Sequence, residues 1–326
     1  MGNRRRIDES EDRMGDYLGV ILAAGHGSRM GPFGEELPKP IVPICNKPLM
    51  AYQLEHLRGL GVTDVIVVIG HLGHHIIRVM GDGAEWGVRL RYVEQEQRLG
   101  LAHAVGQLER HVDRPFVLFL GDIFFEVENL AAMIATYETH RPAAVLGIKD
   151  EPDPEAIKRN FSVVLGEDGA VRRVFEKPRY LENTLKGCGI YLFDERIFDG
   201  VRRTPRTAMR DEYELTDSIQ ILIDYDYPVR AVEVVLWDVN ITYIGDLIAC
   251  CRHELRARGL THLVGAECRI AEDVALVETV VGDHAQIVKP ARLERCVVMP
   301  GAVLDDGLDH REVVFTKTGP LSAVPD

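Results

Sequence analysis

Between residues 17 and 150, the apolar residues follow two spacing patterns that alternate along the chain. Continuous apolar runs of strand length occur at GVILAAG (19–25), DVIVVIG (64–70), PFVLFLGD (115–122) and AAVLGIK (143–149). The segments that carry apolar residues at helical spacing lie between them, at 47–61, 102–112 and 127–140. Continuous apolarity is typical of strands buried on both faces of a parallel sheet. The alternation therefore predicts an α/β fold with right-handed crossovers.

After residue 150 the pattern favours antiparallel pairing. The segment FSVVLGEDGAVRRVFEKP (161–178) predicts a hairpin, because Asp168-Gly169 is a strong signal for a tight turn between two strands. GIYLFD (189–194) and VRAVEVVLWDVN (229–240) are typical of further strands. We therefore expect a sheet that is mostly parallel but mixed.

Beyond Gly259 the spacing of the apolar residues changes again. Small or branched apolar residues recur at about every sixth position, with glycines at 265, 282 and 301. This spacing predicts a short left-handed parallel β-helix over 261–305, of two to three coils at ~18 residues per coil. Irregular β-turns packed on the main domain are the alternative. We expect a catalytic domain over 17–241, a linking helix over 242–260 and a C-terminal cap over 306–326.

The net charge of the chain limits the kinds of partner that it can bind. Of the 326 residues, 46% are hydrophobic and 27% are charged, which is globular composition and argues against a disordered chain. The 38 Lys and Arg against 51 Asp and Glu give a formal charge of −13. Nucleic acids and anionic membrane surfaces are themselves negative, so this charge disfavours both as partners. An anionic ligand must then meet a local cluster of cations.

The N-terminus and the cysteines indicate the compartment. No stretch approaches the ~18 apolar residues of a membrane span, and the basic N-terminal segment lacks the apolar run of a secretory signal. We expect residues 1–16 to form a mobile tail. The six cysteines are scattered without a C-x-x-C pair, which predicts reduced thiols in a cytoplasmic protein rather than a disulfide framework or a zinc site.

The stretch LAAGHGSRMGPFGEELPKP (22–40) concentrates glycines and cations after the first apolar run. Glycines let backbone N–H groups turn toward an anion, and nearby cations add positive charge. Two common phosphate motifs do not fit. No G-x-x-x-x-G-K-[ST] string is present, and Met30 stands at the third glycine of G-x-G-x-x-G. The glycines could also form only a tight strand-to-loop turn.

The same stretch matches G-x-G-[ST]-R-[LM]-x-P-x-x-x-x-x-P-K-P without a gap. In this it resembles the sugar-1-phosphate nucleotidylyltransferases, and the similarity continues in chain order to the helix near Leu255. The resemblance implies a Rossmann-like three-layer sheet. It also implies transfer of a nucleotidyl group from an NTP to a sugar-1-phosphate, with release of pyrophosphate.

The resemblance assigns the nucleotide side of the site. The loop residues that would receive the nucleotide's phosphates are Ala24, Gly25, Gly27 and Ser28. Arg29 and Lys39 would neutralise the reacting phosphates, and both are implied to be catalytic. Gln95 and Gly100 resemble the base-reading segment. An amide suits uracil or thymine, but an amide flip would suit cytosine as well.

Two aspartates at strand ends complete the reaction centre that the resemblance implies. Asp122 follows the run PFVLFLG, where α/β sheets open their ligand crevice, and it is implied to be catalytic and to bind Mg²⁺. Asp238, at the end of another predicted strand, resembles the second ligand. Mg²⁺ is usually held by one or two carboxylates plus substrate phosphates. A lone aspartate after a strand can instead cap a helix or form a turn.

The sugar-phosphate side resembles the family over residues 160–217. Glu176 in E-K-P would accept sugar hydroxyls, and the backbone of Gly189 would lie beside the sugar. Lys177 and Arg210 would hold the phosphate, whereas as isolated charges they would form ordinary surface ion pairs. With the two cations of the glycine loop, they make the local cluster that an acidic protein needs.

Some residues depart from this pattern or carry no assigned chemistry. Phe161-Ser162-Val163 replaces the usual Tyr-Gly-Val, so Ser162 leaves the identity of the sugar open. The histidines at 71, 74 and 75 lack the i,i+4 spacing and acidic partner that zinc sites favour, which predicts a solvated loop. We expect His284 to be structural and the β-helix to be an oligomer contact.

We expect an enzyme that uses Mg²⁺ and joins glucose-1-phosphate to dTTP or UTP as a homo-oligomer, either a dimer or a tetramer. It needs no general base, because a phosphate monoester is already ionised near neutral pH. A non-catalytic, regulatory relative is the alternative. Such relatives tend to lose the Arg or Lys of the glycine loop, and both are present here. Met30 disfavours a third hypothesis, an NAD-dependent enzyme.

Overall fold

The computed structural model describes residues 16–25, 34, 37–207 and 211–323. It divides into two units. The first comprises Met1–Gly25, Gln53–Gly121 and Phe125–Asp238, and the second comprises His26–Tyr52, Asp122–Phe124 and Val239–Asp326. Residues 1–15 of the predicted tail over 1–16 lie outside the described residues, as do four predicted site residues: Gly27, Ser28, Arg29 and Arg210.

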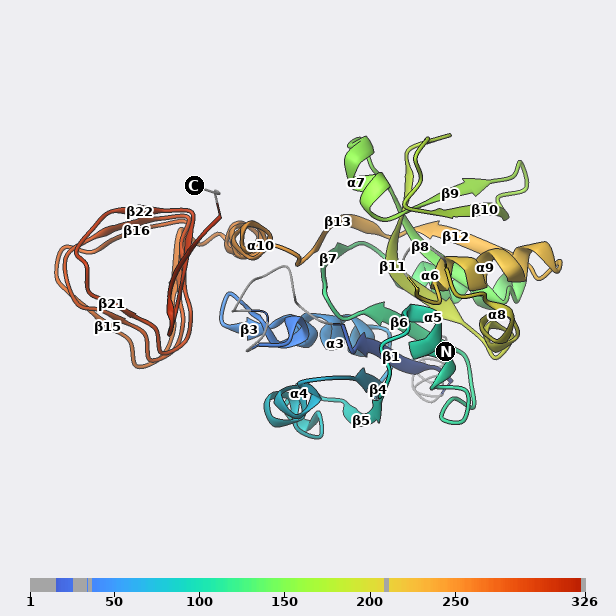
Figure 1. The fold of residues 1–326 in the computed structure, drawn as a ribbon, viewed down its shortest axis with the longest axis horizontal. Coiled ribbons are helices and arrows are strands. Elements are labelled where there is room, and N and C mark those ends of the chain that lie inside the picture. The colour runs from blue at the N-terminus through green and yellow to red at the C-terminus, as the bar shows by residue number, and fades with distance from the viewer. Residues whose placement is uncertain (1–15, 26–33, 35–36, 208–210, 324–326) are drawn as a thin grey trace, which may run out of the picture. The chain divides into compact units, whose positions relative to one another are not determined.

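The first unit is built on a mixed sheet whose main path runs β10-β9-β11-β6-β1-β4-β5 (Figure 1). These strands are β1 (Leu18–Ala23), β4 (Asp64–Ile69), β5 (Arg89–Glu94), β6 (Phe116–Leu120), β9 (Phe161–Leu165), β10 (Val171–Glu176) and β11 (Leu185–Phe193). Off this path, β8 (Ala144–Asp150) pairs with β11 and with β12 (Val229–Glu233). β1 is parallel to both β4 and β6, whereas β11 is antiparallel to β6, β8 and β9. The prediction of a mostly parallel but mixed α/β sheet is confirmed.

The sequence pattern explains the sheet's core. Every residue of β1 is buried, and so are Val65 to Ile69 of β4, as expected for continuous apolar runs in central strands. Full burial of each such side chain is worth ~1.5–3 kcal/mol relative to exposure. Stacked aromatic rings of Phe161, Tyr191 and Phe193 extend this core toward the antiparallel strands.

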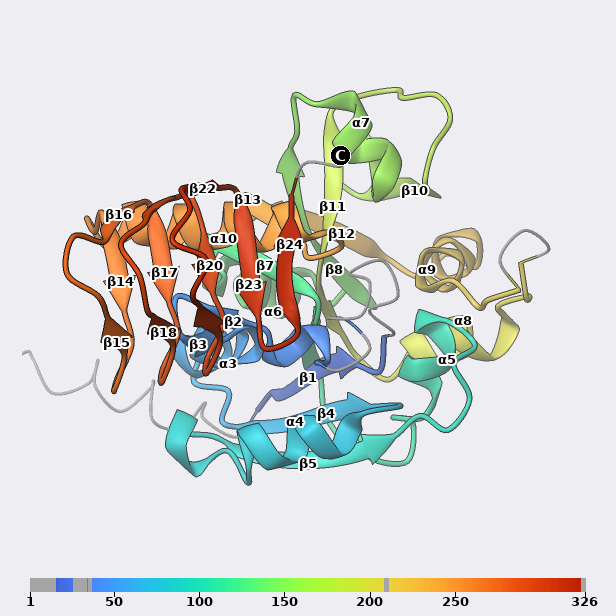
Figure 2. The same cartoon turned by 60° about the vertical axis from the view of Figure 1, so that its left-hand side comes forward.

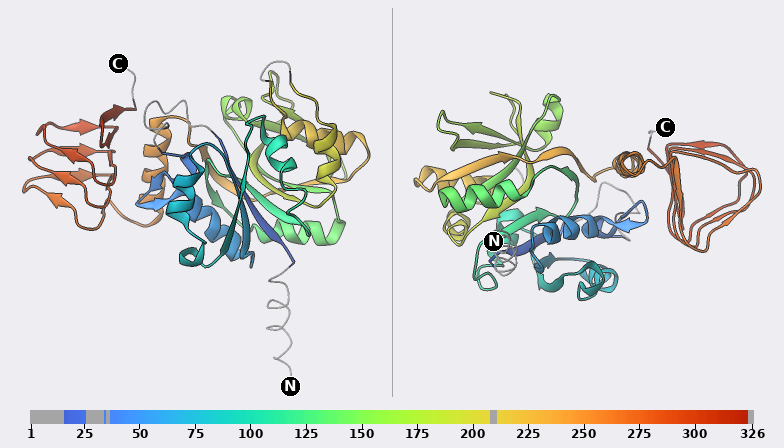
Figure 3. Two further views of the ribbon diagram at one scale, coloured as in Figure 1. Left: turned by 60° about the horizontal axis from the view of Figure 1, so that its bottom comes forward. Right: turned by 180° about the vertical axis from the view of Figure 1, so that it is seen from behind.

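Helices cover both faces of this sheet (Figure 3). They are α3 (Leu49–Gly59), α4 (Gly73–Met80), α5 (Leu101–Gly106), α6 (Ala131–His140), α7 (Pro154–Arg159), α8 (Ile197–Arg203) and α9 (Leu215–Asp224), with the 3₁₀ turn η3 (Ala84–Trp86). The helix predicted over 102–112 is shorter in the structure, where α5 ends at Gly106. The segment 127–140 becomes helical only at Ala131, since Val127 ends β7 (Ile123–Val127) and residues 128–130 belong to neither element. β7 forms a two-stranded sheet with β13 (Val235–Asn240).

The predicted hairpin over 161–178 is confirmed in β9 and β10, which pair antiparallel. Gly169 has φ +71° at the turn, and the Asp168 carboxylate accepts the N–H of Ala170. Both features are what an Asp-Gly turn requires.

The second unit contains a short parallel β-helix. Its three faces are β14-β17-β20-β23, β15-β18-β21 and β16-β19-β22, and Figure 2 shows the first of them with the strands side by side. The first face comprises β14 (His262–Val264), β17 (Thr279–Val281), β20 (Val297–Val298) and β23 (Val313–Thr316). The second comprises β15 (Arg269–Ile270), β18 (Gln286–Ile287) and β21 (Val303–Leu304), and the third β16 (Ala275–Val277), β19 (Arg292–Glu294) and β22 (His310–Arg311).

Apolar residues stack from coil to coil inside this β-helix. Leu263 lies opposite Val280, Val280 opposite Val297, and Val297 opposite Val314, all in parallel register. The stacked strands continue beyond residue 305, and β24 (Gly319–Ser322) then folds back antiparallel on β23. The recurring apolar positions in the sequence are therefore the interior of the coils.

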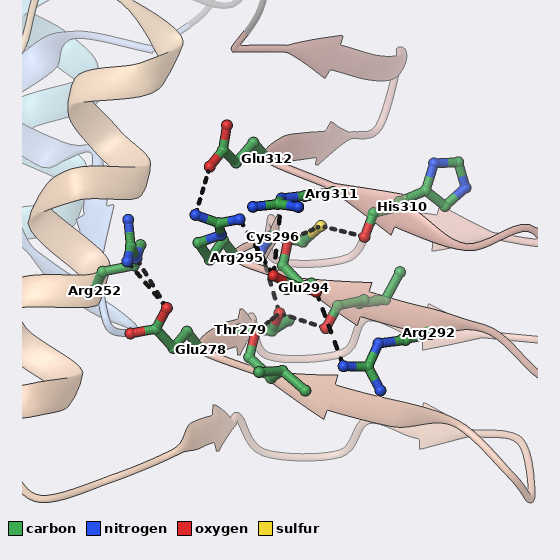
Figure 4. Close-up of polar contacts among 12 residues, drawn as sticks. Arg252, Glu278, Thr279, Arg292, Glu294, Arg295, Cys296, His310, Arg311 and Glu312 are labelled. Carbon is green, nitrogen blue, oxygen red and sulfur yellow. Dashed lines mark hydrogen bonds and ion pairs between the residues drawn. The ribbon is translucent and has the colours of Figure 1, made fainter.

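Ion pairs outside the coils join successive turns to each other and to the helix α10 (Ile244–Ala257) (Figure 4). Glu278 accepts from Arg252 of this helix, with Nη2 and Oε2 3.0 Å apart. Arg295 lies 3.2 Å from Glu294 and 3.0 Å from Glu312, one coil further on. On the other side, α10 packs near β2 (Pro43–Ile44), which pairs with β3 (Lys47–Pro48), and the Asn46 amide donates to the Val281 carbonyl.

Among the described residues, no helix combines the length and apolarity that crossing a membrane would require.

Candidate active site

The carboxyl ends of three neighbouring parallel strands approach each other closely in the first unit. A Cβ added to Gly70, after β4, would lie 2.9 Å from the Ala24 carbonyl oxygen, and one on Gly121, after β6, would lie 2.7 Å from the Leu22 carbonyl oxygen. Both positions therefore require glycine. Ala24 is buried and Gly25 is exposed directly after it. The start of the predicted phosphate loop thus leaves the sheet at the edge where α/β proteins bind ligands.

Lys39 and Asp122, two of the predicted catalytic residues, form an ion pair in the second unit. Lys39 begins the 3₁₀ turn η2 (Lys39–Ile41) and stands between two prolines. Its Nζ lies 3.2 Å from Asp122 Oδ2, and the two side chains are 12% and 40% exposed. The Asp122 carbonyl oxygen accepts the N–H of Ile241 at 2.9 Å, which fixes the aspartate's backbone.

Gln95 and Gly100 meet on the first unit, together with a residue that the sequence did not predict. Gln95 is buried, and its Nε2 lies 3.3 Å from the Gly100 carbonyl oxygen and 2.9 Å from His103 Nδ1. Gly100 has φ +106°, and a Cβ there would lie 2.5 Å from the Tyr213 carbonyl oxygen. Burial lowers the pKa of His103, which favours the neutral ring that can accept a hydrogen bond.

Two of the predicted sugar-phosphate residues, Glu176 and Lys177, lie at the end of the hairpin. Glu176 accepts from Thr216 Oγ1 at 3.2 Å, and Lys177 Nζ lies 3.6 Å from Glu176 Oε1. Lys177 has φ +46°, a left-handed conformation that costs a non-glycine residue free energy and often marks a functional position. Gly189 has φ +74° and lies in β11 between Gly187 and Tyr191, where the strand's pairing register with β8 shifts.

Asp238 occupies a different environment from Asp122. Its side chain is 2% exposed, and Lys186 Nζ donates to both of its oxygens, at 2.7 Å and 2.9 Å. Lys186 was not among the residues predicted from the sequence. The available signal was its charge within the otherwise apolar strand LKGCGIYLF, because a buried lysine needs a buried counter-charge.

The two aspartates differ in how they fit a divalent ion. Asp122 is partly exposed, and among the described contacts only its Oδ2 has a side-chain partner. No group of three or more His, Cys, Asp or Glu that could hold a metal occurs within the part of the chain that the structure describes. An accessible carboxylate that is paired through one oxygen can still bind Mg²⁺ whose other ligands come from substrate phosphates. Asp238, with both oxygens bound to a lysine, does not have this accessibility.

Comparison with known proteins identifies the family of this chain. Residues 18–238 match the nucleotidyl transferase family. The chain belongs to this family. It is a family of enzymes, so the predicted resemblance and the predicted enzyme class, nucleotidyltransferase, are both confirmed.

Two relatives within the nucleotidyl transferase family illustrate the similarity. The chain is 31% identical over 310 residues to a glucose-1-phosphate thymidylyltransferase of Streptomyces antibioticus, covering 94% of this chain and 82% of that protein. It is 32% identical over 227 residues to the UTP–glucose-1-phosphate uridylyltransferase AglF of Haloferax volcanii, covering 70% of this chain and 92% of that protein. It also matches longer members, of which it spans about 60% of the length.

The fold of the nucleotidyl transferase family is also found among solved structures. A UDP-glucose pyrophosphorylase crystallised with UDP-glucose superposes with a TM-score of 0.65 at 20% identity, covering 74% of this chain and 99% of that one. The match extends over most of the chain and supports the fold assignment alone.

Proposed function

We propose that this chain transfers a nucleotidyl group from dTTP or UTP to glucose-1-phosphate, releasing pyrophosphate. The relatives named above support the choice of glucose-1-phosphate and of these two nucleotides. The observation that carries the proposal is the Lys39–Asp122 pair, a cation and an accessible carboxylate on the segments that flank the predicted phosphate loop and follow β6. The cytoplasmic location stays a prediction.

The proposed reaction brings two negatively charged phosphate groups together, so their charge must be neutralised. An ionised oxygen of the sugar phosphate attacks the α-phosphorus of the NTP, and the bond to the pyrophosphate oxygen breaks. The attacking oxygen carries no proton near neutral pH, so no residue has to act as a general base. Lys39 would hold the reacting phosphates in line and offset their charge, and Arg29 would assist it. Mg²⁺ bound by Asp122 and the triphosphate would supply further neutralisation of the phosphate oxygens.

Gln95 is suited to distinguish pyrimidine bases. An isolated amide could present either its donor or its acceptor to a base. In the His103 tautomer that carries its proton on Nε2, both hydrogens of Gln95 Nε2 have acceptors within the protein, namely the Gly100 carbonyl and His103 Nδ1. Oε1 is then the atom available to the base. An acceptor suits the N3–H of uracil and thymine and disfavours cytosine, whose N3 is itself an acceptor.

We predict that His103→Phe relaxes this selection, because the Gln95 amide loses the acceptor that fixes its orientation. The ratio of kcat/KM for dTTP to that for dCTP should fall by about tenfold, the size of one hydrogen-bond discrimination of ~1.4 kcal/mol. His103→Asn, which can still accept, is the matched control and should retain most of the ratio. An unchanged ratio in His103→Phe would contradict this role.

Support for the proposed homo-oligomer comes from the first coil of the β-helix. Ile270 is 36% exposed, although it lies opposite Ile287, which is buried in the next coil. Its neighbour Val264 on the preceding strand is exposed as well. An open coil end of this kind offers apolar side chains and unpaired strand edges to a second copy of the chain.

We predict that Ile270→Lys weakens self-association, because it places a charge in an apolar contact. Light scattering coupled to gel filtration should give a mass above the 36.5 kDa monomer for the unaltered chain and a lower mass for the variant. Val303→Lys, an exposed position two coils away from that end, is the control and should leave the mass unchanged. A monomer of the unaltered chain would refute the oligomer proposal.

The proposed function is tested by incubating each of dTTP, UTP, dCTP, ATP and GTP with a panel of sugar-1-phosphates and Mg²⁺, and measuring pyrophosphate. Release with dTTP or UTP and glucose-1-phosphate is expected. A regulatory relative would bind nucleotide and give no pyrophosphate with any pair. Release with another sugar alone would keep the reaction and correct the substrate.

A further inference from the structure

Four charged side chains form a closed cluster around Asp238 in the first unit. Lys186 Nζ lies 2.7 Å from Asp238 Oδ1 and 3.3 Å from Glu151 Oε2. Lys149 Nζ lies 2.9 Å from the same Glu151 oxygen and 3.7 Å from Asp238 Oδ1. The side chains of Lys186 and Asp238 are 3% and 2% exposed, so this part of the cluster is almost dry.

The sheet brings these residues together. Lys186 on β11 lies opposite Lys149 on β8, so both lysines point to the same face. Glu151 follows β8 directly, and its backbone N–H donates to the Thr184 carbonyl just before β11. On the other side of β11, Ser162 lies opposite Lys186 and is buried. The position where this sequence departs from the family's Tyr-Gly-Val thus adjoins the lysine.

The hydrogen-bonding capacity of Lys186 is used within the cluster. An ammonium has three hydrogens, and three carboxylate oxygens lie within 3.3 Å of Nζ: both oxygens of Asp238 and one of Glu151. Burial would cost an unpaired ammonium free energy, and these three oxygens compensate for it. The lysine is therefore a fixed positive charge at Asp238.

The cluster is also electrically balanced. Two lysines face two carboxylates, which leaves no net charge to attract a cation. A divalent ion added at Asp238 would introduce two positive charges beside two ammonium groups in a site that excludes water. Burial of uncompensated charge costs several kcal/mol per ion. Asp122 also faces one ammonium, that of Lys39, but its side chain is 40% exposed, so water can screen an added ion there.

We propose that Lys186 occupies the place of a divalent cation at Asp238, so that this chain binds the metal ion of its nucleotide through Asp122 and not through Asp238. The inference rests on the proposed function for the requirement of a divalent ion. In it Lys186 is a positioning residue, which fixes the Asp238 carboxylate and neutralises its charge without an ion.

The test is Mn²⁺ binding followed by electron paramagnetic resonance, first on the full chain with α,β-methylene-dTTP. We expect Asp238→Asn to leave the Mn²⁺ dissociation constant unchanged and Asp122→Asn to raise it by about tenfold or more. Equal weakening by the two isosteric substitutions would overturn the inference.

The second arm needs no nucleotide and is independent of the proposed function. Lys186→Met leaves two carboxylates facing one lysine, so this variant should gain a Mn²⁺ site that the unaltered chain lacks. Lys186→Met/Asp238→Asn should lose that site again, and Lys186→Arg should not gain it. Absence of the gain in folded Lys186→Met would overturn the inference. A failure of the unaltered chain to bind Mn²⁺ with nucleotide, alongside this gain, would instead count against the proposed function.

Discussion

Asp122→Asn is expected to lower turnover by about a hundredfold to a thousandfold, the loss typical of removing one charge-stabilising group from a reaction centre. The amide keeps the size of the carboxylate but carries no charge, so it holds a divalent ion poorly and no longer pairs with Lys39. Stability should hardly change. The pair is 40% exposed on the aspartate side, and exposed ion pairs contribute ~0–1 kcal/mol to the free energy of unfolding.

The matched control for this prediction is Asp64→Asn. Asp64 also forms ion pairs, with Arg89 and Arg114, but it stands at the start of β4 rather than after a strand. Its substitution should leave turnover unchanged. Steady-state pyrophosphate release and urea unfolding of both variants make the comparison. Equal turnover in Asp122→Asn and the unaltered chain at saturating Mg²⁺ would reject the role of Asp122.

The second large effect concerns stability. Lys186→Met should lower the free energy of unfolding by about 3–5 kcal/mol, because it leaves Asp238 and Glu151 buried with the single cation Lys149. Lys186→Met/Asp238→Leu should recover much of this loss, since replacing a buried ion pair by apolar residues is often close to neutral. Urea unfolding followed by circular dichroism measures both. A cost below ~1 kcal/mol for Lys186→Met would show that the cluster is solvated like a surface pair.

Much of the fold could be predicted because its signals are local. Continuous apolar runs identified β1, β4, β6 and β8, and Asp168-Gly169 identified the turn between β9 and β10. The recurring apolar positions of the tail also identified the β-helix, because the interior of each coil lies in register with the next. Each of these patterns can be recognised from residues that are close together in the chain.

The predicted bounds of two helices were wrong, because the spacing of apolar residues alone does not decide where a helix begins or ends. α5 ends at Gly106 although apolar residues continue at helical spacing to Val112. Val127, at the start of the other predicted helix, instead ends strand β7, which pairs with the distant β13. The pairing of β7 with β13 lies outside the window that a local pattern covers.

The same difference between local signals and long-range contacts applies to the candidate site. Lys39 and Asp122 could be identified from motifs, and the structure places them 3.2 Å apart. His103 and Lys186 belong to no motif and were not predicted, and the role of Lys186 depends on a neighbour far away in the chain. Lys186 is 52 residues from Asp238, and only the sheet brings the two together.

The most direct measurement of the central claim follows the α-phosphate itself. The protein is incubated with dTTP labelled with ³²P at the α-phosphate, glucose-1-phosphate and Mg²⁺, and the products are separated. We predict that the label appears in a nucleotide sugar and that the pyrophosphate is unlabelled. Label that stays in dTTP, or that appears only in dTMP, would contradict nucleotidyl transfer to a sugar phosphate.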